Sequence, residues 1–177
     1  MTIYSKVYII LSENTNSITE KNGKRVKKKG ILLLATGFGL GLSPVAPGTV
    51  GTLLGVAIAV AVSPLDWVWQ AVLAVSMALV AIPICGEAEK HFGKKDDRRI
   101  VADEFSTFPL CVLWLPIVEH PWLLAVAFLT HRVLDIIKPP PARKMQETEG
   151  GVGIVLDDVI SSLYALVLNH AIWWLLR

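Results

Sequence analysis

The chain has 177 residues, of which 53% are hydrophobic and only 18% charged, and its mean hydropathy is +0.54. Because an average soluble domain carries about 25% charged residues, this composition favours membrane association, and the length suits one domain with a substantial core. The net charge of +2, without a continuing basic and aromatic surface, argues against a nucleic-acid partner. Two widely separated cysteines exclude a disulfide-rich scaffold.

Residues 1–29 are predicted to form a basic N-terminal extension, with a short ordered piece at residues 3–11. Its basic residues gather just before the first long apolar run: Lys21, Lys24, Arg25, Lys27, Lys28 and Lys29. Such a cluster binds anionic lipid headgroups and marks a cytoplasmic flank, although a solvated tail is the alternative. The first residues lack the cleavage pattern of a secretory signal.

A stretch rich in glycine and proline follows, from Thr36 to Thr52. It predicts an irregular loop that ends where a helix begins, at Thr49 or Thr52. Its backbone N–H groups and the hydroxyls of Thr36, Ser43, Thr49 and Thr52 suit a phosphate. No Gly-Lys-Ser/Thr sequence follows, which excludes a nucleotide P-loop. A purely structural loop is the alternative.

Apolar runs at residues 53–62 and 67–85 are separated by a break at residues 63–66. The second is long enough to cross a hydrocarbon core of about 30 Å as a helix, but both runs equally suit a compact helical bundle. Residues 86–99 are polar and predict a solvated connection. Further apolar helices are predicted from Trp122 and over residues 154–176.

Carboxylates interrupt the later apolar segments at three separate places. They are Asp103, Glu104, Asp135, Asp157 and Asp158. An excess of carboxylates over cations, in helices that pack together, is what a hard divalent cation such as Mg²⁺ requires. Arg132, Lys138 and Arg143 would then neutralise a phosphate group. Unrelated helix caps and ion pairs are the alternative explanation.

Two of these carboxylates have distinctive neighbours in the sequence. On a helix, His131 and Arg132 share a face with Asp135, and three prolines after Lys138 end that helix. Asp157 and Asp158 follow the segment Gly150–Gly153, which predicts a glycine-rich turn that allows close backbone approach.

At these residues the sequence resembles the phosphatidylglycerophosphatase A family. The resemblance is carried by four motifs in the family's order: residues 34–49, with Thr-Gly-Phe-Gly, Ser-Pro and Pro-Gly-Thr; Asp103-Glu104-Phe105; Arg132-Val133-Leu134-Asp135 with Lys138-Pro139; and residues 150–154 with Asp157-Asp158. It spans residues 30–170 and leaves out the N-terminal extension.

The resemblance implies an all-α fold, a single compact bundle of about six to eight helices whose glycine- and proline-rich loops form the site. This helical domain would occupy residues 30–177. The implied activity is Mg²⁺-dependent hydrolysis of phosphatidylglycerophosphate to phosphatidylglycerol and phosphate, in phospholipid biosynthesis. The implied location is the cytoplasmic membrane of a bacterium, among anionic lipids, with the site facing the cytoplasm. Peripheral attachment is the alternative.

Roles for individual residues are our own inference on these motif positions. We expect Asp103, Glu104, Asp135 and Asp158 to be catalytic. The same four residues and Asp157 are the expected Mg²⁺ ligands. The expected phosphate-binding residues are Thr36, Ser43, Thr49, Arg132 and Lys138.

Proteins of other classes share some of these features. A small membrane transporter or structural subunit would explain the composition, but it predicts no metal-dependent hydrolysis. A soluble helical module that binds a metal or a phosphorylated metabolite predicts extraction without detergent. A phosphatase of another phosphomonoester would use the same groups.

Overall fold

The computed structural model describes residues 25–177, so the predicted ordered piece at residues 3–11 lies outside the described residues. A helix over residues 25–35 is followed by η1 (Leu40–Leu42), α2 (Pro47–Val62), α3 (Trp67–Phe92), α4 (Ala102–Thr107), η2 (Phe108–Val112), α5 (Trp122–Ile137), α6 (Ala142–Met145) and α7 (Gly150–Leu176). Residues 25–177 contain no strand, which confirms the predicted all-α class.

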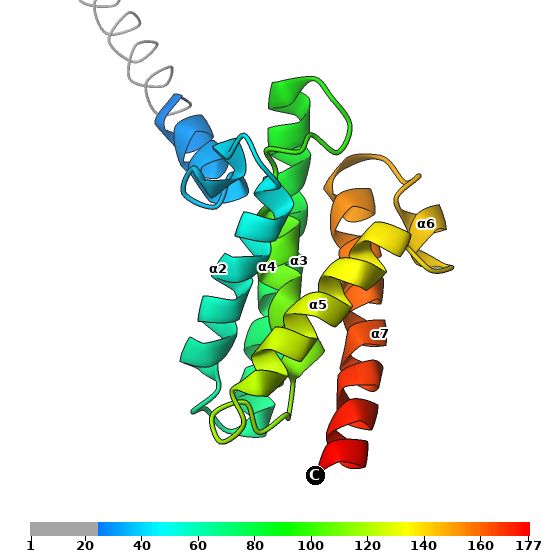
Figure 1. Cartoon of the computed structure of the whole chain (residues 1–177). Coiled ribbons are helices and arrows are strands. Elements are labelled where there is room, and N and C mark those ends of the chain that lie inside the picture. The colour runs from blue at the N-terminus through cyan, green and yellow to red at the C-terminus, as the bar shows by residue number, and fades with distance from the viewer. Residues whose placement is uncertain (1–24) are drawn as a thin grey trace, which may run out of the picture.

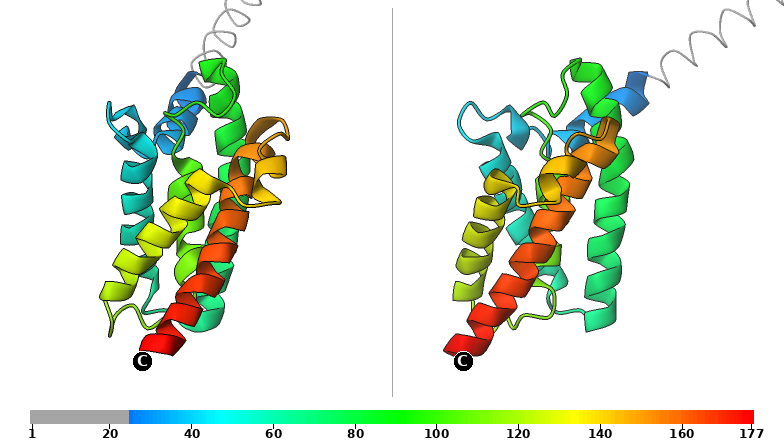
Figure 2. Two further views of the ribbon diagram at one scale, coloured as in Figure 1. Left: turned by 45° about the vertical axis from the view of Figure 1, so that its right-hand side comes forward. Right: turned by 90° about the vertical axis from the view of Figure 1, so that its right-hand side faces the viewer.

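The long helices α2, α3, α5 and α7 run between the same two ends of the molecule (Figures 1 and 2). α2 and α7 begin at the upper end of Figure 1, where α3 and α5 finish, and the chain ends at the lower end. The short helices α4 and η2 lie in the interior, where α4 contacts α2, α3 and α7. The residues of α4 are therefore surrounded by three long helices.

The glycine stretch at residues 150–153 is helical, so the predicted turn is wrong, but the predicted close backbone approach is confirmed. α7 begins at Gly150 and packs against α3 so closely that a Cβ on Gly151 would lie 1.8 Å from the Ile82 carbonyl oxygen. Gly86 of α3 faces the same contact. Glycine weakens an isolated helix by about 1 kcal/mol, but here the absence of side chains lets two backbones touch, and this packing outweighs the local propensity.

Two predicted boundaries are also corrected. α2 begins at Pro47, before Thr49 and Thr52, because a proline at the first helical position loses no hydrogen bond. α3 continues beyond Cys85 through the polar residues 86–92, which were predicted as a connection, and ends at Gly93 with φ 66°. This left-handed conformation is a common helix stop for glycine. The polar last turns of α3 stay helical because the buried residues of the same helix pack against the rest of the bundle.

Much of the apolar side-chain surface faces outward. α3 and α7 are each long and apolar enough to cross a membrane, and only 22% of the apolar part of α3 is buried, against 50% in α7. Val72, Val75 and Leu79 of α3 are 45%, 49% and 60% exposed. Contiguous exposed apolar surface of this kind marks contact with a membrane or a partner.

Aromatic and basic residues lie at opposite ends of the bundle. The tryptophans lie at the starts of α3 and α5, in the loop of residues 113–121 and at the end of α7, all at the lower end: Trp67, Trp69, Trp114, Trp122, Trp173 and Trp174. Every lysine and arginine of residues 25–177 except Arg177 lies in the upper half. The molecule is therefore polarised along its long axis.

Candidate active site

The predicted carboxylates converge in the upper half of the bundle. Asp103 and Glu104 begin α4, Asp135 lies near the end of α5, and Asp157 and Asp158 follow the first two turns of α7. Asp103, Asp157 and Asp158 are buried, and Glu104 and Asp135 are nearly so, with side chains 14% and 13% exposed. Residues far apart in the sequence thus share one interior region.

Asp103 and Glu104 point to different neighbours, as adjacent helical residues should. Asp103 lies beside Cys85 of α3 and near Asp158 of α7. Glu104 lies against α2, where a Cβ on Gly48 would be 2.2 Å from its Oε1 atom, and against Arg132 of α5. Both side chains still reach the interior because long helices surround α4.

The pKa values of the α4 carboxyl groups are raised by burial. Burial, together with the charge of Glu104, holds the pKa of Asp103 well above its ordinary value. Burial raises the pKa of Glu104 from 4.5 to about 8, with a further contribution from Asp158 and Asp135. Such carboxyl groups keep a proton at neutral pH unless a cation takes its place.

Arg132 is the central cation of the site. Its Nη1 atom donates a hydrogen bond of 2.8 Å to Asp135 Oδ2 and lies 3.9 Å from Glu104 Oε1. It also approaches the Thr52 hydroxyl at 3.5 Å. The Arg132 side chain is only 17% exposed, so its ion pair with Asp135 belongs to a partly buried network and does not lie on the surface.

Lys138 supplies a second cation from the end of α5. It adopts φ 50° as the residue that caps the helix, and its ammonium group pairs with Asp157 Oδ2. Asp157 is therefore neutralised within the protein, whereas Asp158, on the next position of α7, has a buried Oδ2 atom without a hydrogen-bond partner among the described residues.

Unpartnered carboxylate oxygens gather in this region. Within residues 25–177 they are Asp103 Oδ1, Glu104 Oε2, Asp157 Oδ1 and Asp158 Oδ2. Buried polar atoms are normally hydrogen-bonded, so these oxygens are available to a ligand. Five carboxylates face two cations, and this excess of negative charge fits a divalent cation.

The geometry limits how such a cation is held. In the part of the chain that the structure describes, no three His, Cys, Asp or Glu side chains are arranged as a ready-made metal cage. Mg²⁺ does not need one, since it is usually bound by one or two carboxylates together with water and phosphate oxygens. The residues present fit that mode of binding.

The three hydroxyl groups that were predicted to bind phosphate, those of Thr36, Ser43 and Thr49, lie in different surroundings. Thr36 donates to the Leu32 carbonyl at 2.9 Å, and Ser43 donates to the Val45 carbonyl at 2.9 Å. Over residues 25–177 neither forms a hydrogen bond with a site carboxylate or cation. Thr49 stands in the first turn of α2, directly after Gly48 in the sequence.

The structure adds residues that are not among the expected site residues, although the hydroxyl of Thr52 is one of the loop hydroxyls that suit a phosphate. Thr52 is fully buried, donates to the Gly48 carbonyl at 2.9 Å and faces Arg132. His131 is also fully buried, and neither ring nitrogen has a partner among residues 25–177. Ser162, one turn beyond Asp158, has a buried unpartnered hydroxyl. The sequence signal for Thr52 and Ser162 is their spacing: each lies four residues after Gly48 or Asp158, and so on the same face of the helix.

Buried carboxylates beside a guanidinium and an ammonium, at one end of an apolar helical bundle, define a helical protein whose site suits a phosphate group and a cation. A family model described as phosphatidylglycerophosphatase A matches residues 33–173. The chain therefore belongs to the phosphatidylglycerophosphatase A family, and it is a phosphatase.

Individual relatives agree with this family. The chain is 36% identical over 166 residues to phosphatidylglycerophosphatase A of Haemophilus influenzae, covering 90% of this chain and 100% of the relative. It is 33% identical over 132 residues to phosphatidylglycerophosphatase A of Escherichia coli, covering 74% and 76%. A Bacteroides thetaiotaomicron protein, provisionally named phosphatidylinositol-3-phosphatase, is 34% identical over 157 residues, covering 82% and 94%. No solved structure matches the chain significantly.

Proposed function

We propose that this protein is a Mg²⁺-dependent phosphatase that hydrolyses phosphatidylglycerophosphate to phosphatidylglycerol and phosphate at a bacterial membrane. The family and two named relatives support the substrate. The observation that carries the proposal is the group of buried, partly unpartnered carboxylates beside Arg132 and Lys138. The Bacteroides relative supports a second substrate of the same chemical class, a phosphoinositide carrying a phosphomonoester.

The protein's residues would divide the chemistry among themselves. Asp103, Glu104, Asp135, Asp157 and Asp158 are the candidates for holding Mg²⁺, which when bound supplies charge neutralisation at the phosphate oxygens and acidifies water. Arg132 and Lys138 would bind the remaining phosphate charge. Glu104, which stands beside Arg132, is our candidate base for the attacking water. A carboxylate acting as nucleophile is the alternative.

We also propose that the upper half of the bundle faces the cytoplasm. Lysine and arginine concentrate on the cytoplasmic side of membrane proteins, and tryptophan concentrates at membrane interfaces. The basic residues lie in the upper half with the candidate site, whereas the tryptophans lie at the lower end. In this orientation α3 and α7 cross the bilayer, and the site meets the lipid headgroups. Peripheral attachment by the same surfaces remains the alternative.

The test is release of inorganic phosphate from dispersed phosphatidylglycerophosphate by the purified protein, with Mg²⁺ or with excess chelator. We expect release only with Mg²⁺, and the same assay with phosphatidylinositol 3-phosphate measures substrate preference. Release that the chelator does not reduce would overturn the metal requirement. No release from either lipid by folded protein would overturn the proposed activity.

Asparagine substitutions connect this activity to the site. Asp103→Asn and Asp158→Asn should abolish phosphate release while leaving the helical circular dichroism unchanged. The matched control is Asp66→Asn, since Asp66 is exposed at the lower end of the bundle. Retained turnover in both site variants would remove Asp103 and Asp158 from the catalytic machinery.

A further inference from the structure

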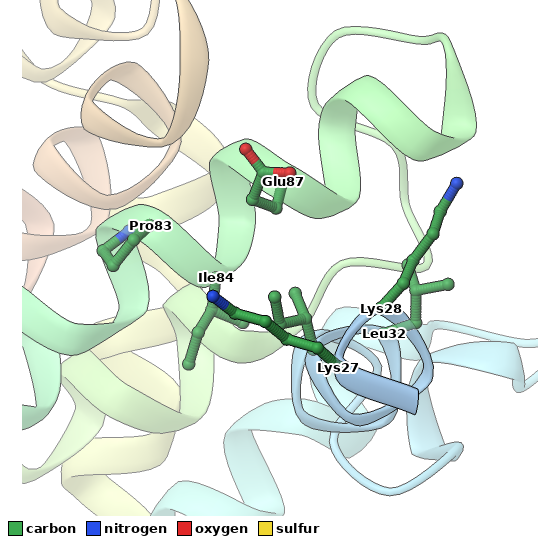
Figure 3. A pocket seen from close by; sticks show the side chains of 7 residues that line it. Lys27, Lys28, Leu32, Pro83, Ile84 and Glu87 are labelled. Carbon is green, nitrogen blue, oxygen red and sulfur yellow. The ribbon is translucent and has the colours of Figure 1, made fainter. Parts of the chain in front are cut away.

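A groove separates the helix of residues 25–35 from α3 (Figure 3). It has a cavity volume of about 640 Å³, and its lining residues are Lys27, Lys28, Ile31, Leu32, Pro83, Ile84 and Glu87. None of the carboxylates of the candidate active site lines it. The groove is therefore a feature separate from the proposed phosphatase site.

Two cations border the groove. Lys27 and Lys28 project from the helix of residues 25–35, and their ammonium groups point away from each other, that of Lys27 towards the side of Ile84 (Figure 3). Across residues 25–177 no carboxylate lies within ion-pair distance of either ammonium group. Glu87, on the opposite wall, is already paired with Lys90 at 2.8 Å. The groove thus offers two cations to an anionic group.

The other lining residues of the groove are mainly apolar. A second, separate cavity of about 290 Å³ is also lined by Ile84 and lies along α3 past Val80 and Met77 to Leu73. Leu34 and Phe105 form its other wall. At 1.5 Å per residue, the path from Ile84 to Leu73 is about 16 Å long. One leaflet of a bilayer core is about 15 Å thick.

We propose that this groove binds one anionic phospholipid of the bilayer, with its headgroup between the side chains of Lys27 and Lys28 and one acyl chain along α3. The order of groups matches that of a phospholipid, because the lysines lie towards the upper end and the apolar walls run from there towards the lower end. Lysine binds phosphate as a point charge and is attracted to anionic headgroups.

The proposal rests on the membrane association in the proposed function, but it does not depend on phosphatase activity. The bound lipid would fill the space between α3 and the N-terminal helix, and would hold that helix beside the bundle. Its readout is lipid binding, so failure of the proposal and failure of the proposed activity are distinguishable.

The charged part is tested with the full-length protein in nanodiscs that contain equal amounts of phosphatidylglycerol and phosphatidylcholine. Native mass spectrometry should show one retained phosphatidylglycerol per protein in preference to phosphatidylcholine. The double substitution Lys27→Ala and Lys28→Ala should lower that preference by on the order of tenfold or more, because each lysine contributes to headgroup attraction.

A matched control removes the same charge elsewhere. Lys94 and Arg98 are exposed at the same end of the bundle and do not line the groove, so Lys94→Ala with Arg98→Ala should keep the preference. If both double variants lost the preference for phosphatidylglycerol equally, the lipid would be attracted by the charge of the whole surface and not by the groove. That result would overturn the proposal. Equal retention of both lipids by the unmodified protein would also overturn it.

The apolar part is tested by filling the groove. Ile84→Trp should abolish retention of the lipid, whereas Val75→Trp, on an exposed part of α3 that lines neither cavity, should not. Phosphate release in detergent should persist in both variants, which shows that they are folded. If active Ile84→Trp protein still retained the lipid fully, the proposal would be contradicted. It would also be contradicted if the mass spectra showed a dimer that holds no lipid in the groove. If Ile84→Trp protein is inactive, Leu73→Trp replaces it at the far end of the path, and the same outcomes apply.

Discussion

Glu104 occupies space that exists only because residue 48 has no side chain. A Cβ at Gly48 would lie 2.2 Å from Glu104 Oε1 and 3.3 Å from Arg132 Nη2. Since the carboxylate is the far end of a flexible side chain, it can move aside at small cost in stability. The position of the carboxylate relative to Arg132 would nevertheless be lost.

We therefore predict that Gly48→Ala lowers phosphate release by about 100-fold, as expected for a displacement near 1 Å at a reacting group. Its unfolding free energy should change by less than about 1 kcal/mol, because alanine also favours the helix. Gly30→Ala is the control, since Gly30 is helical and a Cβ there meets nothing within 4 Å. Equal activities in the two variants would show that Glu104 need not be held in place.

The raised pKa of Glu104 also makes stability depend on pH. Below pH 4.5 the carboxyl group is protonated in both the folded and the unfolded chain. Between pH 4.5 and about 8 the folded chain retains a proton that the unfolded chain releases, so this group makes unfolding easier as pH rises. Above about pH 8 its contribution is constant.

Glu104→Gln should remove that contribution. With chelator present, we predict that the variant gains unfolding free energy relative to the unmodified protein as the pH increases from 5 to 8. Denaturant unfolding followed by circular dichroism at several pH values measures the difference. A difference that stays constant over this range would mean that Glu104 ionises normally in the folded protein.

At the scale of elements, the contact between α3 and α7 sets the geometry of the site. Asp157 and Asp158 lie less than two turns beyond Gly151, whose Cβ would meet the Ile82 carbonyl oxygen at 1.8 Å and the Gly86 nitrogen at 2.7 Å. Both atoms belong to the backbone, which cannot move aside as a side chain can. The two helices must therefore separate if residue 151 carries a side chain.

Gly151→Ala is accordingly predicted to lower the unfolding free energy by about 3 kcal/mol, at the upper end of the usual cost of overpacking. Val152→Ala, next to it on the partly exposed side of α7, should cost less than about 1 kcal/mol. Thermal unfolding in one detergent compares the variants directly. Similar midpoints for the two would show that α7 readily shifts along α3.

This contact also shows where prediction from sequence ends. Local periodicity and composition were enough to predict several features. These are the apolar runs, their break at residues 63–66 and the segments that carry the carboxylates. The helical state of residues 150–153 was not predictable in this way, since it depends on a neighbouring backbone about 65 residues earlier in the chain. Likewise, the sequence showed the hydroxyl of Thr36 but not that it would donate its hydrogen bond to the carbonyl of Leu32.

For the candidate site, the sequence indicated which carboxylates come together but not how they pair. Three separated acidic segments suggested convergence, and the structure brings them together. That Lys138 pairs with Asp157, and not with the neighbouring Asp158, could not be predicted, because adjacent helical residues point in directions about 100° apart and only the packing of α7 decides which one faces Lys138. Such directions follow from packing between elements.

For the whole molecule, the separation of basic and aromatic residues leads to a prediction of orientation. Lys94 and Glu119 are exposed at the upper and lower ends, and the native thiols of Cys85 and Cys111 are fully buried. We predict that a membrane-impermeant maleimide labels Glu119→Cys protein in intact spheroplasts, and labels Lys94→Cys protein only after the membrane is opened.

Other labelling patterns would be equally informative. Labelling of Lys94→Cys protein alone in intact spheroplasts would reverse the proposed orientation. Protection of both positions until lysis, together with extraction in the absence of detergent, would establish peripheral attachment on the cytoplasmic side. In that case the exposed apolar surface of α3 would need another partner.

The grouping of every tryptophan at the lower end has a spectroscopic consequence. Indole emission from this protein reports the environment of the end furthest from the carboxylates, where five of the six rings are at least 39% exposed. Quenching by brominated acyl chains will therefore measure the depth of that end in the bilayer. Occupation of the carboxylate site should leave the emission almost unchanged, so a fluorescence titration with substrate would give a silent result even when binding is tight.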